Sequence, residues 1–419
     1  MIVFLLAAKY AFAAVLSPND SVNTGPGNSQ MVFYRLSDGT KTTSSNTDWH
    51  LAITVRSTEF PNSPLGGTTI RINEANGVAA YVFPNSDSSQ FAQLSVNSYS
   101  FWNKLHDSDS LMDLGAFNAI RTSNVFDFGW GFYNSASHHV VGTNFFLVKL
   151  PNGKLKKFYV EKLLYDTAFI IRYANIDNTN EQVLNIRKKD YLGKNFVYLN
   201  LENNALMDKE PLRTDWDLQF IKYTASKGSS REYEPEVGVW LNKGWSAARR
   251  ADTDVNSFDF TGIAVSPSMS AVGWNWKTKY FNDGSRDAQA NFSYKVIDSL
   301  AYLLTKGNKN YKLVFTDFST TTGNIGFNLQ ELWATDIIES APVLSSKVYP
   351  NPTENFVTIE IPVQDAEVTI TDLAGRTVVY QRLTDTINTL NVSALSKGVY
   401  LVGVSSGNQK STHKLVLAR

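Results

Sequence analysis

The stretch FVTIEIP at residues 356–362 sets the fold of the C-terminal part of the chain. Its apolar and polar residues alternate, which is typical of a strand with one buried face, and its Val, Ile and Thr residues favour extended backbone. The same pattern returns in four further stretches, separated by turns at Ala374-Gly375-Arg376 and Lys397-Gly398: VTITDL (368–373), TVVYQRL (377–383), VYLVGV (399–404) and HKLVL (413–417). The pattern predicts an Ig-like β-sandwich of about 70 residues.

Four short motifs follow one another across residues 347–419: YPNP (349–352), DLAGR (372–376), LSKGVYLV (395–402) and KLVL (414–417). Their order and spacing resemble the type A C-terminal sorting domain of the type IX secretion system. On this resemblance, the sorting-motif residues are Tyr349, Pro350, Asn351, Pro352, Gly375, Arg376, Gly398, Tyr400, Lys414 and Leu415. An ordinary C-terminal sandwich used for adhesion is the alternative.

The sorting-domain resemblance implies a route and a set of partners. The protein would cross the outer membrane of a bacterium of the Bacteroidota by contact with the type IX secretion machinery. It would then remain at the cell surface, for example by attachment to surface polysaccharide, or be released.

The N-terminus carries an export signal of its own. Residues 2–8, IVFLLAA, form an apolar run, and Ala11-Phe12-Ala13 fits the small-x-small pattern of a cleavage site. We therefore predict a signal peptide over 1–13 and a linker over 14–30; a buried first strand is the alternative. The run is shorter than the roughly 20 residues of a membrane span.

Composition limits the class of protein. A chain of 419 residues suggests two or three domains, and its high aromatic content of 13% favours strands. Lys and Arg (39) balance Asp and Glu (39), so we expect no nucleic-acid partner. The chain has no cysteine, which excludes disulfides, cysteine-ligated metals, thiol nucleophiles and lipid attachment through an N-terminal cysteine. We find no G-x-S-x-G, H-E-x-x-H or P-loop motif, and we expect no enzyme.

The body of the chain contains an internal repeat. TDWHLAI (47–53) nearly coincides with TDWDLQF (214–220). FDFGWGFYN (126–134) has an echo in VGWNWKTKYFN (272–282), and a hairpin pattern at 145–163 has one at 301–318. Three echoes in the same order indicate a duplicated unit of about 150 residues.

This series of core aromatic residues resembles the HmuY-like haem-binding family of Bacteroidota, with GVWLN (238–242) and TGNIGFNLQEL (322–332) similar to that family's middle and last strands. The resemblance implies a mainly β fold of two HmuY-like domains in tandem. Copy 1 would span 31–190, copy 2 would span 191–335, and a linker (336–346) would join them to the sorting domain (347–419). It also implies a protein that captures haem, or receives it from a haem-carrying protein.

A haem carrier needs one or two axial ligands, His or Met, over an apolar slot. Copy 1 offers His106, Met112, His138 and His139. Adjacent residues of a strand point to opposite faces, so at most one of His138 and His139 serves one pocket. His106 and His138 form the first predicted pair, with His139 or Met112 as substitutes. Copy 2 has no histidine, and a solvated surface role for the copy 1 histidines is the alternative.

Three functional hypotheses follow. The first is an exported surface protein that captures haem. The second is a surface adhesin or structural component with incidental histidines. The third is glycan binding through exposed aromatic side chains such as Trp274 and Trp276, although their alternate spacing also fits a core pair.

Overall fold

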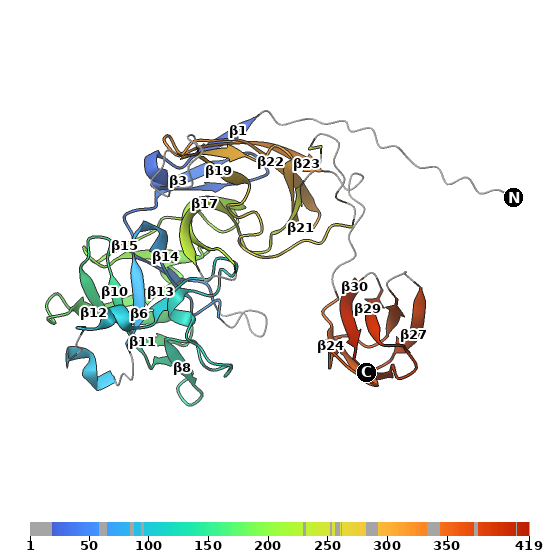
Figure 1. The fold of residues 1–419 in the computed structure, drawn as a ribbon. Coiled ribbons are helices and arrows are strands. Elements are labelled where there is room, and N and C mark those ends of the chain that lie inside the picture. Colours follow the sequence, from blue (N-terminus) through green and yellow to red (C-terminus); the bar gives the residue numbers. More distant parts are fainter. Residues whose placement is uncertain are drawn as a thin grey trace. The chain divides into compact units, whose positions relative to one another are not determined.

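The computed structural model describes residues 19–57, 65–83, 88–93, 96–228, 232–251, 254–255, 260, 262–281, 292–332, 344–372, 376–407 and 409–418. Strands dominate these ranges, which confirms the mainly β prediction (Figure 1). The predicted signal peptide (1–13) and residues 336–343 of the predicted linker lie outside the described residues. The chain divides into a first compact unit, Met1–Phe260 with Ala264–Ile337, and a second that contains Ile338–Arg419.

The first unit consists of two β-sandwiches, which we call lobe 1 and lobe 2. In lobe 1, the sheet β15-β14-β4-β5 faces a larger sheet with the path β13-β12-β11-β10-β6-β7, to which the hairpin β8–β9 is added beside β11. The strands of lobe 1 are β4 (Leu51–Thr54), β5 (Ile70–Ile72), β6 (Ala79–Val82), β7 (Lys104–Leu105), β8 (Gly131–Asn134), β9 (His139–Gly142), β10 (Phe145–Lys149), β11 (Leu155–Leu164), β12 (Ala168–Asn175), β13 (Gln182–Arg187), β14 (Phe196–Asn200) and β15 (Ala205–Met207).

In lobe 2, the sheet β17-β16-β2-β3 faces the sheet β1-β23-β22-β21-β18, and β19 and β20 form a separate hairpin. The strands of lobe 2 are β1 (Asp20–Asn23), β2 (Gln30–Tyr34), β3 (Lys41–Ser45), β16 (Leu218–Ser226), β17 (Tyr233–Leu241), β18 (Ser246–Ala251), β19 (Lys277–Phe281), β20 (Phe292–Val296), β21 (Leu300–Lys306), β22 (Lys309–Phe318) and β23 (Asn324–Leu332). The helical turns of the first unit are all short 3₁₀ segments: η1 (Pro26–Asn28), η2 (Glu74–Asn76), η3 (Ser88–Gln93), η4 (Tyr99–Phe101), η5 (Ala116–Asn118) and η6 (Lys188–Tyr191).

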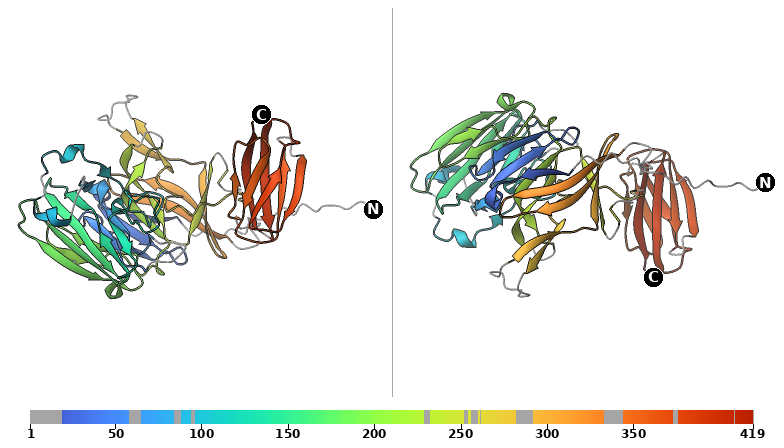
Figure 2. Two further views of the ribbon diagram at one scale, coloured as in Figure 1. Left: turned by 90° about the horizontal axis from the view of Figure 1, so that it is seen from below. Right: turned by 90° about the horizontal axis from the view of Figure 1, so that it is seen from above.

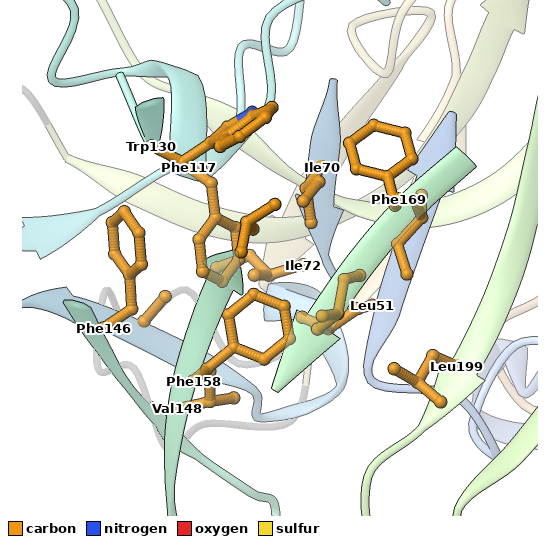
Figure 3. Packing of buried hydrophobic residues seen from close by; sticks show 14 of the residues in the cluster. Leu51, Ile70, Ile72, Phe117, Trp130, Phe146, Val148, Phe158, Phe169 and Leu199 are labelled. Carbon is orange, nitrogen blue, oxygen red and sulfur yellow. The ribbon is translucent and has the colours of Figure 1, made fainter. Parts of the chain in front are cut away.

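Each lobe has its own aromatic core. In lobe 1, Phe117, Trp130 and Phe158 are fully buried between the two sheets, together with aliphatic residues of β4 and β5 (Figure 3). In lobe 2, Trp276 stacks on Phe315 with the ring centroids 4.1 Å apart. Burial of one such side chain contributes roughly 1.5–3 kcal/mol to folding. In a chain without disulfides, these aromatic cores are a main source of the stability of each lobe.

The two lobes have the same strand order. The first strands of each sequence copy, however, belong to the lobe formed by the rest of the other copy. β1, β2 and β3 occupy in lobe 2 the places that β13, β14 and β15 occupy in lobe 1. The sequence duplication is thus visible in the fold, but the predicted boundaries 31–190 and 191–335 do not separate the lobes. β2 and β3, at the start of predicted copy 1, belong to the sheet of β16, whereas β14, from predicted copy 2, pairs with β4 of lobe 1.

The predicted linker over 14–30 is wrong in its second half. Asp20–Asn23 forms β1, which pairs antiparallel with β23, and Pro26–Asn28 forms η1. A four-residue edge strand with a single fully buried apolar side chain, Val22, carries too weak an alternation to be recognised from sequence.

Hydrogen bonds repeat between the lobes and support the duplication. His50 Nδ1 accepts a bond from the backbone N–H of Leu201 in lobe 1, and Asp217 Oδ2 accepts the matching bond from Leu36 in lobe 2. Asn73 Nδ2 donates to the carbonyl oxygen of Trp49, and Asn242 Nδ2 donates to that of Trp216. His50, which lies in the repeated motif, therefore has a structural role: it binds the backbone at the end of β14.

The two middle sheets pack face to face, so that lobes 1 and 2 form four stacked layers (Figure 2). We call this contact the junction. The lobe 1 side contributes Ala52, Phe196 and Tyr198, and the lobe 2 side contributes Phe33 and Ile221. Both middle sheets are therefore buried on two faces, which explains the continuous burial of β4 and of the first half of β16.

The second unit is the predicted β-sandwich. The sheet β24-β25-β28 faces the sheet β27-β26-β29-β30 around an aliphatic core. Its strands are β24 (Lys347–Tyr349), β25 (Phe356–Glu360), β26 (Ala366–Thr371), β27 (Thr377–Leu383), β28 (Ile387–Asn391), β29 (Gly398–Ser406) and β30 (Gln409–Leu417). Leu344, placed in the predicted linker, packs into this core. The unit therefore begins a few residues before the predicted start at 347.

Candidate functional site

The hairpin β8–β9 presents aromatic side chains on both of its faces. Phe132 and Val141 are cross-strand neighbours on the outer face and are 38% and 39% exposed. Tyr133 and Val140 form the next pair, and both line a pocket on the opposite face. Gly129, just before the hairpin, has a φ of 85°, and a Cβ there would lie 2.6 Å from the carbonyl oxygen of Phe117. Only glycine fits this entry to the hairpin.

The pocket beside the hairpin has a volume of about 380 Å³. It lies between the hairpin and the turn that joins β11 to β12. Its walls are mostly aromatic or aliphatic, with a few polar groups among them: Thr68, Phe126, Phe128, Tyr133, His138, Val140, Leu163, Tyr165 and Asp166. A pocket of this size, with apolar walls and few polar groups, is typical of a small-molecule site.

His138 is the histidine that lines this pocket. Its backbone has a φ of 55°, in the left-handed region, and its side chain is exposed. Its Nδ1 lies 2.7 Å from the hydroxyl of Tyr133. Within the described residues, Nε2 has no hydrogen-bond partner. A Nδ1–H that donates to Tyr133 leaves the Nε2 lone pair available as a ligand.

The other predicted ligands lie elsewhere. His139 accepts a bond from the backbone N–H of Tyr165 through Nδ1, and it is not among the pocket-lining residues. His106 lies at the junction, where Nδ1 is 2.9 Å from Glu74 and the ring stacks on Tyr233 of lobe 2 with centroids 3.7 Å apart. His106 and His138 therefore contact different parts of the molecule.

Met112 belongs to the junction as well. It packs against the hydrophobic cluster between the middle sheets. The acidic loop around it connects the lobes, because Asp109 accepts a bond from the backbone N–H of Ser226 and Asp113 pairs with Lys243. Within the described residues, no group of three or more His, Asp or Glu is arranged to hold a metal ion.

The sequence analysis did not identify the aromatic residues that form the pocket. Phe126, Phe128 and Tyr133 belong to the segment FDFGWGFYN, which we interpreted only as a repeat echo. Tyr165 follows β11 in a turn and is 62% exposed. An exposed Tyr with a positive φ of 45° is unusual, but neither feature can be recognised from sequence.

Two carboxyl groups are buried at the junction. Desolvation raises the pKa of Glu210 to about 7, and it raises the pKa of Asp107 to about 6. Glu210 accepts bonds from the backbone N–H groups of Asn195 and Phe196, and Asp107 accepts one from Ala116. These bonds hold both carboxyl groups in place although burial disfavours their charged forms.

The raised pKa of Glu210 predicts a pH-dependent stability. A carboxyl group with a raised pKa in the folded state stabilises the fold while it is protonated, and this contribution is lost as the pH rises from the ordinary value of 4.5 through about 7. We expect the unfolding free energy of the wild type, relative to Glu210→Gln, to fall by at least about 1 kcal/mol between pH 5 and pH 8. Urea titration of both proteins measures it. Asp107 also titrates in this pH range, but it is present in both proteins and its contribution cancels in the comparison. A difference that is constant with pH would contradict the prediction.

In the second unit, Asn351 of the YPNP motif connects the start of the sandwich to its last strand. Its Nδ2 donates to the carbonyl oxygen of Lys414 at 2.6 Å, and its Oδ1 accepts a bond from the backbone N–H of Val416 at 2.9 Å. Thr353 adds two backbone bonds to the end of β30. One amide side chain thus satisfies a donor and an acceptor on the outer edge of β30.

Replacement of Asn351 by alanine should destabilise this unit specifically. The change removes two hydrogen bonds, each worth roughly 0.5–1.5 kcal/mol, so we expect a loss of about 1–3 kcal/mol in the second unit. Differential scanning calorimetry of the full chain should show a lower midpoint for the transition of the second unit. The first unit serves as the internal control, and an unchanged thermogram would show that Asn351 does not hold β30.

The other sorting-motif residues have structural partners. Both Pro350 and Pro352 follow cis peptide bonds. Arg376 binds Asp372 through Nε and its backbone N–H, and the Tyr400 hydroxyl donates to the carbonyl oxygen of Ser396. Leu415 is buried opposite Tyr400 in the register of β29 and β30, which Gly398 begins. Tyr349 is 42% exposed, and Gly375 lies outside the described residues.

Comparison with known families confirms the sorting domain. Residues 347–418 match the family described as the secretion system C-terminal sorting domain. The protein therefore carries a type IX secretion signal and is exported across the outer membrane to the cell surface or the extracellular space. None of the helices in the described ranges has the length and hydropathy of a membrane span.

Comparisons over the rest of the chain assign neither a fold nor a function. No curated protein matches the sequence. Among solved structures, PorZ, a surface component of the type IX secretion system of Porphyromonas gingivalis, is similar over 69% of this chain and 42% of its own, at 14% identity and a TM-score of 0.17. The BSP domain of a biofilm-associated protein is similar over 96% of this chain and 66% of its own, at 11% identity and a TM-score of 0.16. Such TM-scores carry no argument about fold or function, and the HmuY-like resemblance stays a prediction.

Proposed function

We propose that this exported protein is a non-catalytic binding protein, and that the pocket beside His138 holds a planar, largely apolar ligand such as haem. The observation that carries the proposal is the placement of a histidine with an unpartnered Nε2 in a pocket of about 380 Å³ with aromatic walls. Phe126 and Tyr133 stack with centroids 5.7 Å apart, and both rings line the pocket.

The described residues fit haem with one histidine ligand and not with the predicted pair. His106 is held by Glu74 and Tyr233 at the junction, and it does not line the pocket of His138. His138 alone offers an imidazole nitrogen toward apolar walls. Haem supplies an iron whose axial position a neutral imidazole can fill. The Tyr133 hydroxyl fixes the orientation of the His138 ring by its contact with Nδ1.

Titration of the full chain with haemin, followed in the Soret region, tests the proposal. We expect a saturable change at micromolar protein, and at least about a tenfold weaker affinity for His138→Ala because the axial bond is lost. His106→Ala is the matched control and should bind as the wild type does, because His106 does not line the pocket. Equal binding by His138→Ala, or a featureless increase without saturation, would overturn the haem assignment.

A surface adhesin or structural protein without haem is the second candidate. The structural roles of His106 and the lack of histidine in 191–335 favour it. Glycan binding through the predicted Trp pair has less support, because Trp276 is fully buried and the ammonium of Lys227 lies 3.2 Å from the ring centroid of Trp274. The exposed ring of Tyr165 would instead offer a stacking surface, and a carbohydrate array on the wild type and Tyr165→Ala distinguishes these cases.

A further inference from the structure

The junction between the lobes contains two adjoining cavities of about 40 Å³ and 20 Å³. They lie between the middle sheets and share six lining residues: Trp49, Arg71, Ile72, Asp107, Ile221 and Trp240. A cavity holds a water molecule once it offers about 10–15 Å³ to a water-sized probe and two or more polar partners. By volume, both cavities have room for water.

Side chains lining these cavities carry buried polar atoms without a protein partner. They are the indole N–H groups of Trp216 and Trp240, the Oδ1 atom of Asn195 and the hydroxyls of Tyr223 and Thr224. A buried donor or acceptor left unpaired costs about 1–3 kcal/mol. Five such atoms around one interior space would strongly destabilise the fold unless water molecules satisfy them.

The duplication explains why one of these atoms, the indole N–H of Trp216, lacks a partner. In lobe 1 the indole N–H of Trp49 donates to Asn46 Oδ1 at 3.3 Å. Trp216 occupies the matching place in lobe 2, but the residue three positions before it is Arg213 instead of Asn. Position 213 therefore offers no side-chain acceptor like that of Asn46, and the Trp216 N–H has no protein partner among the described residues.

We propose that the two cavities form one hydrated chamber, in which a cluster of ordered water molecules bridges Trp216, Trp240, Asn195 and Tyr223. Both hydrogen-bond donors and acceptors are present, as a water cluster requires. Water-mediated bonds across the chamber would join lobe 1, through Asn195, to lobe 2. Part of the contact between the two middle sheets is therefore mediated by water.

The chamber has a route of exchange with solvent. Met112 and Met269 line both the larger cavity and an open cleft of about 630 Å³ between the lobes. Methionine side chains are unbranched and flexible, so their rotation can open a passage without a change in the backbone. Water in the chamber should therefore exchange with the bulk.

Magnetisation transfer from water to indole N–H groups tests the proposal on the full chain with ¹⁵N-labelled tryptophan. Trp→Phe variants at positions 130, 216 and 240 assign the signals. We expect cross-peaks to water for Trp216 and Trp240 but none for Trp130, whose buried N–H donates to the carbonyl oxygen of Thr68 at 2.8 Å. If Trp216 and Trp240 showed no cross-peaks to water, as expected for Trp130, the proposal of a hydrated chamber would be overturned.

A near-isosteric variant gives an independent test with a definite sign. Tyr223→Phe removes one unpartnered hydroxyl: in a hydrated chamber the urea midpoint should fall, whereas in a dry one it should rise or stay unchanged. Tyr173→Phe is the control, because its buried hydroxyl donates to Asn204 Oδ1 at 2.9 Å and its loss should lower the midpoint in either case. A midpoint for Tyr223→Phe at or above that of the wild type overturns the proposal.

Discussion

Replacement of Trp130 by alanine is expected to lower the unfolding free energy of the first unit by about 3–5 kcal/mol. Trp130 is fully buried in the core of lobe 1, and its ring lies 5.9 Å from that of Phe169 (Figure 3). Its indole N–H also donates to the carbonyl oxygen of Thr68. Alanine would leave a large cavity and remove the shorter of the two hydrogen bonds that the Thr68 carbonyl oxygen accepts. Urea unfolding followed by circular dichroism measures the loss.

Phe132→Ala is the matched control for Trp130→Ala. It lies two residues further along the same hairpin and is 38% exposed on the outer face. Its removal should cost less than about 1 kcal/mol, because the side chain lies at the surface and its loss leaves no enclosed cavity. If both variants lost the same stability, Trp130 would not be the centre of the lobe 1 core.

Replacement of Gly142 by alanine should have an effect of similar size for a different reason. A Cβ at Gly142 would lie 1.9 Å from the carbonyl oxygen of Val160 and 2.8 Å from the ring of Tyr159. Backbone cannot yield as a flexible side chain does, so β9 would have to separate from β11. We expect a loss of roughly 3 kcal/mol or more in unfolding free energy. Because Val140 and Leu163 pair across these strands and line the pocket, ligand binding should be lost as well.

Gly398→Ala is the control for the steric argument. A Cβ at Gly398 would meet only the ring of Tyr400, at an ordinary 3.8 Å. Its effect on the second unit should stay within about 0.5 kcal/mol. Calorimetry of both variants separates the two units. A Gly142→Ala protein with the wild-type transition would show that β9 and β11 do not approach as closely as described.

Local patterns in the sequence predicted a large part of the architecture. Alternation at 356–362 and in the later stretches gives the strands of the second unit, because one face of each sheet is buried and the other is not. The echo between 145–163 and 301–318 corresponds to the hairpins β10–β11 and β21–β22, and both carry a register shift at matching places, after Val160 and after Phe315.

The exchange of strands between lobes could not be predicted in this way. β2 and β14 have similar apolar patterns, and alternation shows which face of a strand is buried but not which sheet receives it. For the same reason the predicted copies were assigned as separate domains, although each completes the other.

The candidate site shows a similar limit. Four of the residues that line the pocket come from the single segment 126–139, so a large part of the pocket is formed by residues that are close in sequence. His106 was paired with His138 because both are histidines of copy 1, yet Tyr233, which holds His106, is distant in sequence and comes from lobe 2. Side-chain contacts between distant strands depend on register and layer order, which composition and spacing do not contain.

The spin state of the ferric haem complex tests the central functional claim most directly. Electron paramagnetic resonance of the full chain, saturated with one equivalent of haemin, distinguishes one axial histidine from two. We expect a high-spin signal that disappears with the bound haem in His138→Ala, because His138 is the one histidine among the described residues that line the pocket. A low-spin signal of two histidine ligands that is lost in His106→Ala, or the absence of a stoichiometric complex, would contradict it.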